Sequence, residues 1–149
     1  MKPRDVGTVK IRRARLQDAE RIAELSGQLG YPAARNDIVR RMKQMRPVAQ
    51  HAVFIAESDN AVIGWLHVSV TPLLEVGRCA EVNGLIVAEG QRGGGAGAKL
   101  LRAAEGWAKS KGCAGMSVRS NVIRERAHEF YLRNGYEHYK TQKAFRKPL

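Results

Sequence analysis

The sequence is poor in cysteine: Cys79 and Cys113 are the only two, and they stand far apart. Zinc sites and redox motifs place their cysteines in closely spaced pairs, so we expect no metal site in this chain. Nothing in the spacing favours a disulfide either. We interpret both residues as reduced thiols that pack inside a cytoplasmic protein.

Long apolar runs are also missing. No stretch of about 18 apolar residues is present, and the basic N-terminus MKPRDVGTVKIRR lacks the apolar segment of a secretory signal. We therefore expect a cytoplasmic protein without a membrane partner. A chain of 149 residues can bury its apolar surface around one core, so residues 1–149 are predicted to form a single domain.

Acidic residues are few relative to basic ones: 14 Asp and Glu stand against 26 Lys and Arg, for a formal net charge of +12. Such a charge favours anionic partners, either a phosphorylated cofactor or a nucleic acid. Aromatic residues make up only 6% of the chain, which leaves few stacking platforms for single-stranded nucleic acid, and no tail-like basic block is present. We expect no specific nucleic-acid partner, and charge-driven binding to nucleic acid is kept as a third hypothesis.

The hydrophobic pattern predicts strands and helices in alternation. Strands are expected at residues 9–14, 51–57, 62–70, 79–87, 116–119, 136–139 and 143–146. Helices are expected at residues 18–29 and 37–45, from the glycine-rich segment to Lys111, and at residues 125–133. Asp18 is expected to cap the first helix, and Thr71-Pro72 to interrupt the strand pattern.

A glycine-rich segment, Gln91 to Gly97, lies between a predicted strand and a predicted helix. Glycines let the backbone approach a ligand, and the first amides of a helix point at it with the positive end of the helix dipole behind them. A Walker loop is excluded because no Gly-Lys-Ser/Thr occurs. A dinucleotide fingerprint fits only loosely, as Gly93-x-Gly95-x-x-Ala98 without a later acidic partner, and a merely flexible loop stays open.

The surroundings of this loop carry a family resemblance. The segment LIVAEGQRGGGAGAKLLRAAEGWA resembles motif A of the GCN5-related N-acetyltransferase (GNAT) superfamily, whose signature is Q/R-x-x-G-x-G/A. Arg92, Gly95 and Gly97 take its first, fourth and sixth positions. The same pattern also fits one residue earlier, with Gln91, Gly94 and Ala96. We prefer the later register because it places Leu100-Leu101 where the family has paired helix leucines.

The C-terminal third is similar to motif B of the same family, in the segment RERAHEFYLRNGYE. The family often has an asparagine seven residues before its tyrosine, and here that position is Arg124. Asn121 stands near enough to serve in its place at the cofactor. With the N-terminal strand and helix, the resemblance spans nearly the whole chain.

The resemblance implies an α/β (α+β) GNAT fold. Its mixed central sheet would have six to seven strands, splay at the cofactor site beside Val87, and be flanked by about four helices. It also implies acetyl-CoA as co-substrate, with the pantetheine along the main chain of Leu85, Ile86 and Val87. The main-chain amides of Gly93, Gly94, Gly95, Ala96, Gly97 and Ala98 would bind the pyrophosphate, and Arg92 would add positive charge.

Amide formation from a thioester needs a neutral amine, a stabilised oxyanion and a proton for the departing thiolate. The resemblance gives Tyr131 the role of general acid near the sulfur, and Glu81 that of general base. The plainer alternatives are a tyrosine that only packs and a carboxylate that only faces solvent. Strand alternation predicts Glu81, Asn83, Leu85 and Val87 on one face. His128 is a third candidate, although a lone histidine is more often structural.

We therefore predict an N-acetyltransferase that moves an acetyl group directly to a primary amine of a small molecule or peptide, in the cytoplasm and with a homodimer allowed. The alternative from another class is a non-catalytic module that binds or senses acyl-CoA. The segments expected to bind the acceptor, residues 30–36 and 71–78, contain only Glu75 as a carboxylate. A small or weakly charged amine is therefore favoured over a polycationic aminoglycoside or a lysine-rich tail.

Overall fold

The computed structural model describes residues 8–149, which divide into two compact units between Arg119 and Ser120. The first unit is built on a five-stranded sheet with the strand order β1-β2-β3-β4-β5. The first four strands pair antiparallel and β5 pairs parallel with β4, so the sheet is mixed, as predicted. The strands are Lys10–Arg13 (β1), His51–Ser58 (β2), Ala61–Leu73 (β3), Gly77–Val87 (β4) and Met116–Val118 (β5).

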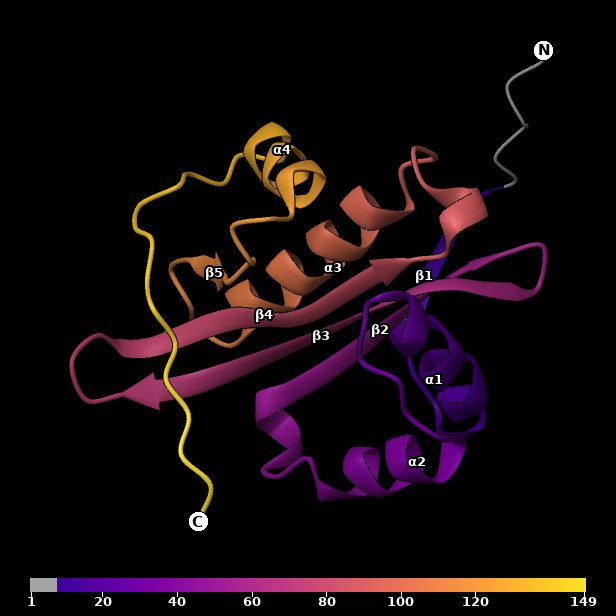
Figure 1. The fold of residues 1–149 in the computed structure, drawn as a ribbon, viewed down its shortest axis with the longest axis horizontal. Coiled ribbons are helices and arrows are strands. Elements are labelled where there is room, and N and C mark those ends of the chain that lie inside the picture. Colours follow the sequence, from indigo (N-terminus) through magenta and orange to yellow (C-terminus); the bar gives the residue numbers. More distant parts are fainter. Residues whose placement is uncertain (1–7) are drawn as a thin grey trace. The chain divides into compact units, whose positions relative to one another are not determined.

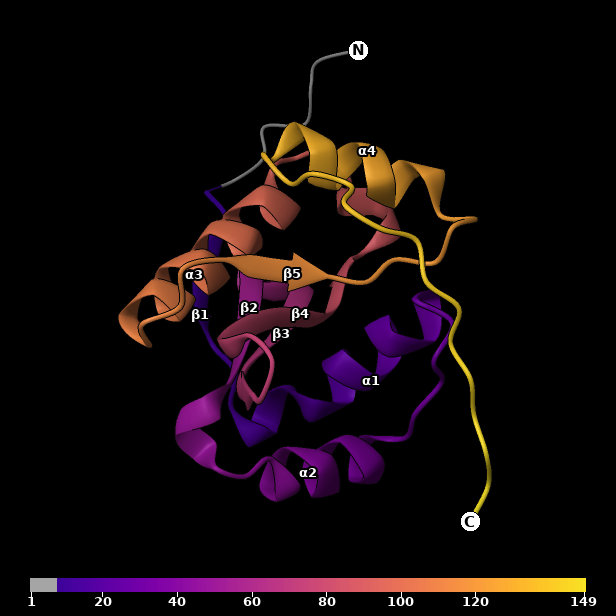
Figure 2. The ribbon, with the colours of Figure 1, turned by 90° about the vertical axis from the view of Figure 1, so that its left-hand side faces the viewer.

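Three helices cover the two faces of this sheet. Helices α1 (Ala19–Gln28) and α2 (Arg35–Gln44) lie on one face and α3 (Ala96–Ser110) lies on the other, as Figure 1 and Figure 2 show. Short 3₁₀ turns lie at Leu16–Asp18 (η1), Val48–Gln50 (η2) and Glu89–Gln91 (η3). No described helix is long and apolar enough to cross a membrane.

Helices α1 and α3 contact the sheet through apolar stripes at helical spacing, and α2 packs chiefly against α1. On the first face, Ile22 of α1 and Ile38 of α2 belong to one buried cluster with Ile55 of β2. On the second face, Leu100 and Leu101 of α3 are buried. These buried residues on the two faces hold α1, α2 and α3 in position relative to the strands. The site described below lies where β4 ends and α3 begins.

The second unit, Ser120–Leu149, contains helix α4 (Glu125–Arg133) and no strand in its described residues. The strands predicted at residues 136–139 and 143–146 are therefore wrong, and the sheet has five strands rather than six to seven. The aromatic residues of this segment fit a strand locally, but Tyr139 and Phe145 are exposed. A strand is stable only when it pairs and buries a face, which local composition does not reveal.

Strand β3 continues through Thr71 and Pro72, where the sequence predicted an interruption. Pro72 stands opposite Arg78 near the end of the β3–β4 hairpin. The pairing of β3 with β2 ends at Ser69, so Pro72 lies on a stretch that is paired on one side only. Proline is tolerated on such an edge because its missing N–H can point away from the ladder.

A β-bulge in β4 changes which residues share a face. His67 of β3 pairs with Gly84 and Val68 pairs with Val82, so Asn83 is the extra residue between them. Residues before and after the bulge therefore alternate out of phase. Glu81 shares the α1/α2 face, whereas Leu85 and Val87 turn to the α3 face, where Val87 and Leu100 both approach Gly64. The prediction that Glu81, Leu85 and Val87 share one face is wrong.

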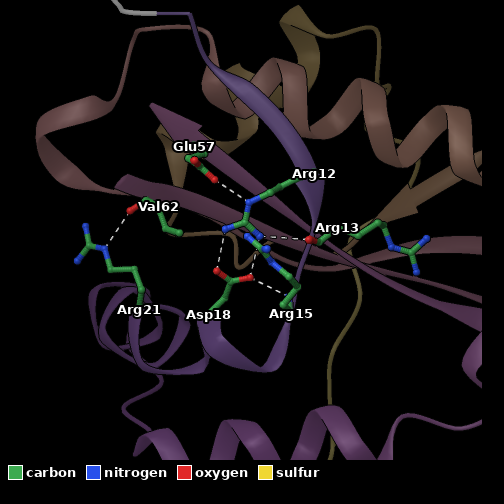
Figure 3. Close-up of polar contacts among 7 residues, drawn as sticks. All are labelled: Arg12, Arg13, Arg15, Asp18, Arg21, Glu57 and Val62. Carbon is green, nitrogen blue, oxygen red and sulfur yellow. Dashed lines mark hydrogen bonds and ion pairs between the residues drawn. The ribbon is translucent and has the colours of Figure 1, made fainter. Parts of the chain in front are cut away.

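A charged network joins β1, β2 and the start of α1 (Figure 3). Arg12 donates from both terminal nitrogens to the Asp18 carboxylate at 2.8 Å, and from Nε to Glu57 at 2.6 Å. Asp18 also accepts the Arg15 N–H at 2.7 Å. Asp18 stands at the N-cap of α1 but makes no side-chain cap there, so the predicted capping role is replaced by this ion pair. The hydrogen bonds from Arg12 hold the pKa of the Asp18 carboxyl below its ordinary value despite burial.

We expect Asp18→Asn to lower the free energy of unfolding by about 1–3 kcal/mol, because the charge-assisted hydrogen bonds to Arg12 are weakened. Since the folded pKa of Asp18 is depressed, its contribution is complete above the unfolded pKa near 3.8 and is lost as pH falls through the lower folded value. In urea titrations from pH 3 to pH 7, the difference in free energy of unfolding between wild type and variant should be smallest at pH 3 and largest at neutral pH. Glu20→Gln, an exposed carboxylate change in α1, should behave as wild type at every pH.

Candidate active site

The junction between β4 and α3 is an open glycine loop. Gly93 and Gly95 adopt positive φ angles of 88° and 85°, a left-handed conformation that costs other residues about 1–2 kcal/mol. A Cβ built on Gly95 would meet no atom within 4 Å. Glycine is therefore demanded here by backbone conformation rather than by crowding, and the space above the loop is open.

The first turn of α3 presents unpaired main-chain amides. Gly95 is the N-cap, and the Lys99 N–H donates to its carbonyl at 3.1 Å as the first bond of the helix. The N–H groups of Ala96, Gly97 and Ala98 come before that bond and have no intrahelical acceptor. The first turn holds no acidic residue that would compete for them. An arrangement of this kind binds phosphate groups, because the amides and the helix dipole act on the same anion.

The loop is held at its start by side chains on both sides. Arg92 folds back so that its Nε donates to the carbonyl of Val87 at 3.2 Å, and its side chain stays exposed beside the glycines. The N–H of Glu89 donates to the Gln28 side chain at the end of α1 at 3.3 Å. The guanidinium group of Arg92 thus lies at the surface next to the glycine loop, as the sequence predicted.

The last residues of β4 have an edge without a strand partner. β4 and β5 pair only where Ala80–Val82 face Met116–Val118. β5 ends at Val118, opposite Val82, so on the β5 side no described strand pairs with Leu85, Ile86 or Val87. The edge of β4 that was predicted to face the cofactor is therefore free, and an extended ligand could add to this edge as a strand does.

A cleft of about 320 Å³ opens between α1, α2 and the sheet. Its apolar lining comes from Ile22, Leu29, Ile38, Met42, Met45 and Val53, together with the aromatic rings of Tyr31 and Trp65. The polar lining residues are Ser26, Arg41, His67 and Asn83, and among residues 8–149 no carboxylate lines the cleft. Of the two segments expected to bind the acceptor, residues 30–36 contribute Tyr31. Residues 71–78 form the far end of the β3–β4 hairpin and contribute nothing to the lining.

Two histidines meet at one side of this cleft. Nδ1 of His51 and Nε2 of His67 lie 3.1 Å apart, and their rings stack with centroids separated by 5.4 Å. Burial, with a smaller contribution from His51, lowers the pKa of His67 to about 4. His67 is therefore neutral at physiological pH, and one imidazole of the pair donates a hydrogen bond to the other.

The bulge shapes the floor of the cleft. The Asn83 side chain donates to the Ser69 hydroxyl at 2.7 Å, which fixes the bulged residue. Gly84 follows, and a Cβ on this residue would approach the Trp65 ring to 2.8 Å. The absence of a side chain on Gly84 therefore allows the Trp65 ring to approach β4, and Gly84 itself lines the cleft. The bulge is adjacent in sequence to the free edge that begins at Leu85.

Glu81 lies on the cleft side of the sheet but not in the lining of the cleft. Its carboxylate forms an ion pair with Nε of Arg119 at 3.3 Å, and the Arg119 side chain is largely exposed. Glu81 pairs with Ser69, whose hydroxyl accepts the hydrogen bond from Asn83. Glu81 therefore lies on the same face as Ser69, two residues before the bulge.

Tyr131, Asn121 and His128 belong to the second unit. The Tyr131 ring makes edge contacts with Phe130 and Tyr136, and burial raises its pKa to about 12, against a smaller lowering by Arg124. Asn121 organises the turn before α4: its side-chain oxygen accepts the Ile123 N–H at 3.2 Å. His128 contacts the Asn121 carbonyl at 2.9 Å, which supports a structural role for this histidine.

Sequence reasoning missed the residues that line the cleft. His51 and His67 stand on neighbouring antiparallel strands, so the register of the predicted hairpin could have paired them. Arg41 and Trp65 carry no local signal, because one lies on a polar helix and the other inside a strand. Both line the same cleft only in the folded chain.

Comparison with known proteins gives a consistent result. The model of the Acetyltransferase (GNAT) family matches residues 16–136. An aminoglycoside N(6')-acetyltransferase type 1 from Klebsiella aerogenes is 31% identical over 111 residues, which cover 72% of this chain and 71% of that protein. The structure of the aminoglycoside N-acetyltransferase AAC(6')-Iy in complex with CoA superposes with a TM-score of 0.86, at 21% identity and full coverage of both chains. A transcriptional regulator from Bacillus halodurans C-125 superposes with a TM-score of 0.80, at 25% identity, over 93% of this chain and all of the other.

Proposed function

The chain belongs to the acetyltransferase (GNAT) family, and from that membership we propose that it acetylates a primary amine of a small molecule. The family gives the reaction class and the co-substrate: the chain is an N-acetyltransferase that uses acetyl-CoA, as the sequence predicted. A small-molecule acceptor is supported by the Klebsiella aerogenes relative, whose name specifies an aminoglycoside.

The junction of β4 and α3 is the observation that most supports the cofactor site. The open loop at Gly93 and Gly95 and the amides up to Ala98 fit a pyrophosphate, with Arg92 beside them. The free edge at Leu85–Val87 fits an extended pantetheine. The bound acetyl-CoA would supply an activated acetyl thioester. The residues of the chain hold and align it against the cleft.

The reaction forms a carbon–nitrogen bond and breaks a carbon–sulfur bond. The acceptor loses a proton as its nitrogen attacks, and the departing sulfur gains one, so the products are an amide and a thiol. We assign proton acceptance to Glu81, directly or through water, and proton donation to the Tyr131 hydroxyl, whose raised pKa of about 12 keeps it protonated at physiological pH. Asn121 is proposed to support the cofactor through its side-chain nitrogen, since its oxygen is used in the turn.

Three further features belong to the same proposal. The family match runs from residue 16 to 136 and so crosses the boundary at Ser120, which supports one functional domain. Cys79 and Cys113 are both free thiols, which supports a reducing, cytoplasmic setting. A homodimer stays a prediction, which light scattering on the purified protein tests.

We expect release of free thiol from acetyl-CoA only when a primary amine is present, and a mass increase of one acetyl group on that amine. Glu81→Gln should reduce kcat/KM by about 10²- to 10⁴-fold at neutral pH with unchanged affinity for acetyl-CoA. Glu20→Gln, the same change at an exposed carboxylate of α1 outside the lining of the cleft, serves as the control. Binding of acetyl-CoA without turnover of any amine in a broad panel would contradict the proposal and favour a sensing module.

A further inference from the structure

We infer that the cleft binds an acceptor whose amine is carried on an apolar or aromatic body together with an anionic group that pairs with Arg41. This inference rests on the proposed function, because it assigns the acceptor of the same reaction. It also separates this chain from enzymes built for polycationic acceptors.

The charge of the cleft supports the anionic group. Arg41 lines the cleft and is exposed to solvent; it makes no hydrogen bond or ion pair with any residue from 8 to 149, and its charge acts on Asp37 one turn away only through space. Its neighbour Arg40 differs, because it is paired with Asp37 at 3.0 Å. Carboxylates and phosphates match the planar fork of an arginine in two parallel hydrogen bonds. An unpaired arginine in a small-molecule cleft is therefore a specific position for an anion.

The wider electrostatic field has the same sign. Helix α2 carries Arg35, Arg40, Arg41 and Lys43 against the single carboxylate Asp37. Within the described part of the chain the lining of the cleft holds no carboxylate, and Glu81, on the same face of the sheet, is paired with Arg119. Several ammonium groups on one acceptor would therefore meet a positive surface without counter-ions, which costs binding free energy.

The shape and polarity of the cleft support the apolar body. Met42 of α2 and Met45, which follows this helix, line the cleft together with Trp65 and Val53 of the sheet, and methionine adapts to ligands of different outline. A volume of about 320 Å³ is at the small end of the range for small-molecule sites. A compact amine with a ring or branched side chain fits this lining, whereas a strongly hydrated polyol amine would leave its hydroxyl groups unpaired.

The same features help the amine to react. The groups that face the cleft are Tyr31, Arg41 of α2 and His67 of β3, with His51 of β2 behind it, and none of them is an anion at neutral pH. A partly apolar site with a nearby cation disfavours the ammonium form of a bound amine. The acceptor is thus held by its anionic end while its amine end is driven toward the neutral, nucleophilic state.

Binding is measured separately from turnover. The chain has two tryptophans, and Trp107 packs on the opposite face of the sheet from Trp65. In a Trp107→Phe background, the fluorescence of Trp65 reports occupation of the cleft. The probes are two matched pairs: phenylalanine against phenethylamine, and 4-(aminomethyl)benzoate against benzylamine. Each pair differs by a carboxylate. Kanamycin serves as the polycationic acceptor.

We expect at least one carboxylated amine to bind and to be acetylated with a higher kcat/KM than its uncharged partner and than kanamycin. Arg41→Gln should raise Kd and KM for that amine by about 10- to 100-fold and leave the values for its partner unchanged. Arg41→Lys should recover part of the loss. Arg40→Gln removes the same charge one residue away, outside the lining, and should have little effect.

Preference for kanamycin, or equal effects of Arg41→Gln on both members of each pair, would overturn the inference while leaving the transferase function intact. Carboxylated amines that bind in an Arg41-dependent way but are never acetylated would instead support the assigned ligand class and contradict the proposed function. Absence of any Trp65 response and of any turnover for the carboxylated amines would overturn the assigned class.

Discussion

Replacing Gly95 by glutamate is expected to abolish acetyl-CoA binding while the protein stays folded. The new carboxylate would stand at the amides of Ala96 and Gly97, where the pyrophosphate is proposed to bind. Two like charges about 4 Å apart repel by roughly 4 kcal/mol at a protein surface, which corresponds to about a thousandfold in Kd. The cost to the fold is smaller, about 1–2 kcal/mol for the positive φ, because no atom crowds the new Cβ.

Two controls separate charge from backbone strain. Gly95→Ala has the same positive φ without a charge, so it should keep most of the affinity for acetyl-CoA. Gly112→Glu places a carboxylate at another open, positive-φ glycine just past the opposite end of α3, roughly 22 Å away. It should lower the melting temperature at least as much and leave binding unchanged. Calorimetry with acetyl-CoA on the three variants tests this, and tight binding by Gly95→Glu would remove the pyrophosphate site from the loop.

The glycine loop and the helix that follows it could be predicted because their determinants are local. A strand, a run of glycines and an apolar stripe at Leu100, Leu101 and Ala104 are adjacent in sequence, and each acts on its own segment. The family resemblance rests on the same local segment, and the family match confirms it. The limits of α1 and α4 were also close to those predicted, for the same reason.

The bulge at Asn83 could not be predicted, because it exists only in the register between two strands. Asn83 and Gly84 read as ordinary strand residues, and simple alternation then places Glu81 with Leu85. One inserted residue reverses this relation, since side chains alternate with a period of two. The bulge matters for the site because it separates these residues. Glu81 lies on the cleft face, whereas the side chains of Leu85 and Val87 turn into the core beside α3.

The acceptor cleft could not be predicted because its determinants are not local. Its lining residues come from five separate elements of the chain. Arg41 is one of several arginines on a polar helix, and only the packing of α2 on the sheet distinguishes it from Arg40. The sequence did indicate a scarcity of carboxylates near the acceptor. That Arg41 lines the cleft, where it could bind an anionic group, could be seen only in the folded chain.

Tyr131→Phe is expected to lower kcat by about 10- to 1,000-fold with little change in affinity for acetyl-CoA, because only the hydroxyl that would protonate the departing sulfur is removed. Burial raises the pKa of this phenol to about 12, so it stays protonated through the whole range in which the protein can be assayed. A phenol with a raised pKa is also a weaker acid, which places the effect below the upper limit for general-acid catalysis.

The ring contacts with Phe130 and Tyr136 are retained in Tyr131→Phe, so the fold should be preserved. Tyr139→Phe, a change at an exposed tyrosine of the same unit, is the matched control and should keep full activity. Because the pKa of Tyr131 is about 12, its hydroxyl is still almost fully protonated at pH 10, and the wild-type rate should show no alkaline loss due to this residue up to that pH. Steady-state rates from pH 6 to pH 10 and calorimetry with acetyl-CoA test both statements. Full activity of Tyr131→Phe would assign the proton to another donor, and a parallel loss of cofactor affinity would make Tyr131 a binding residue instead.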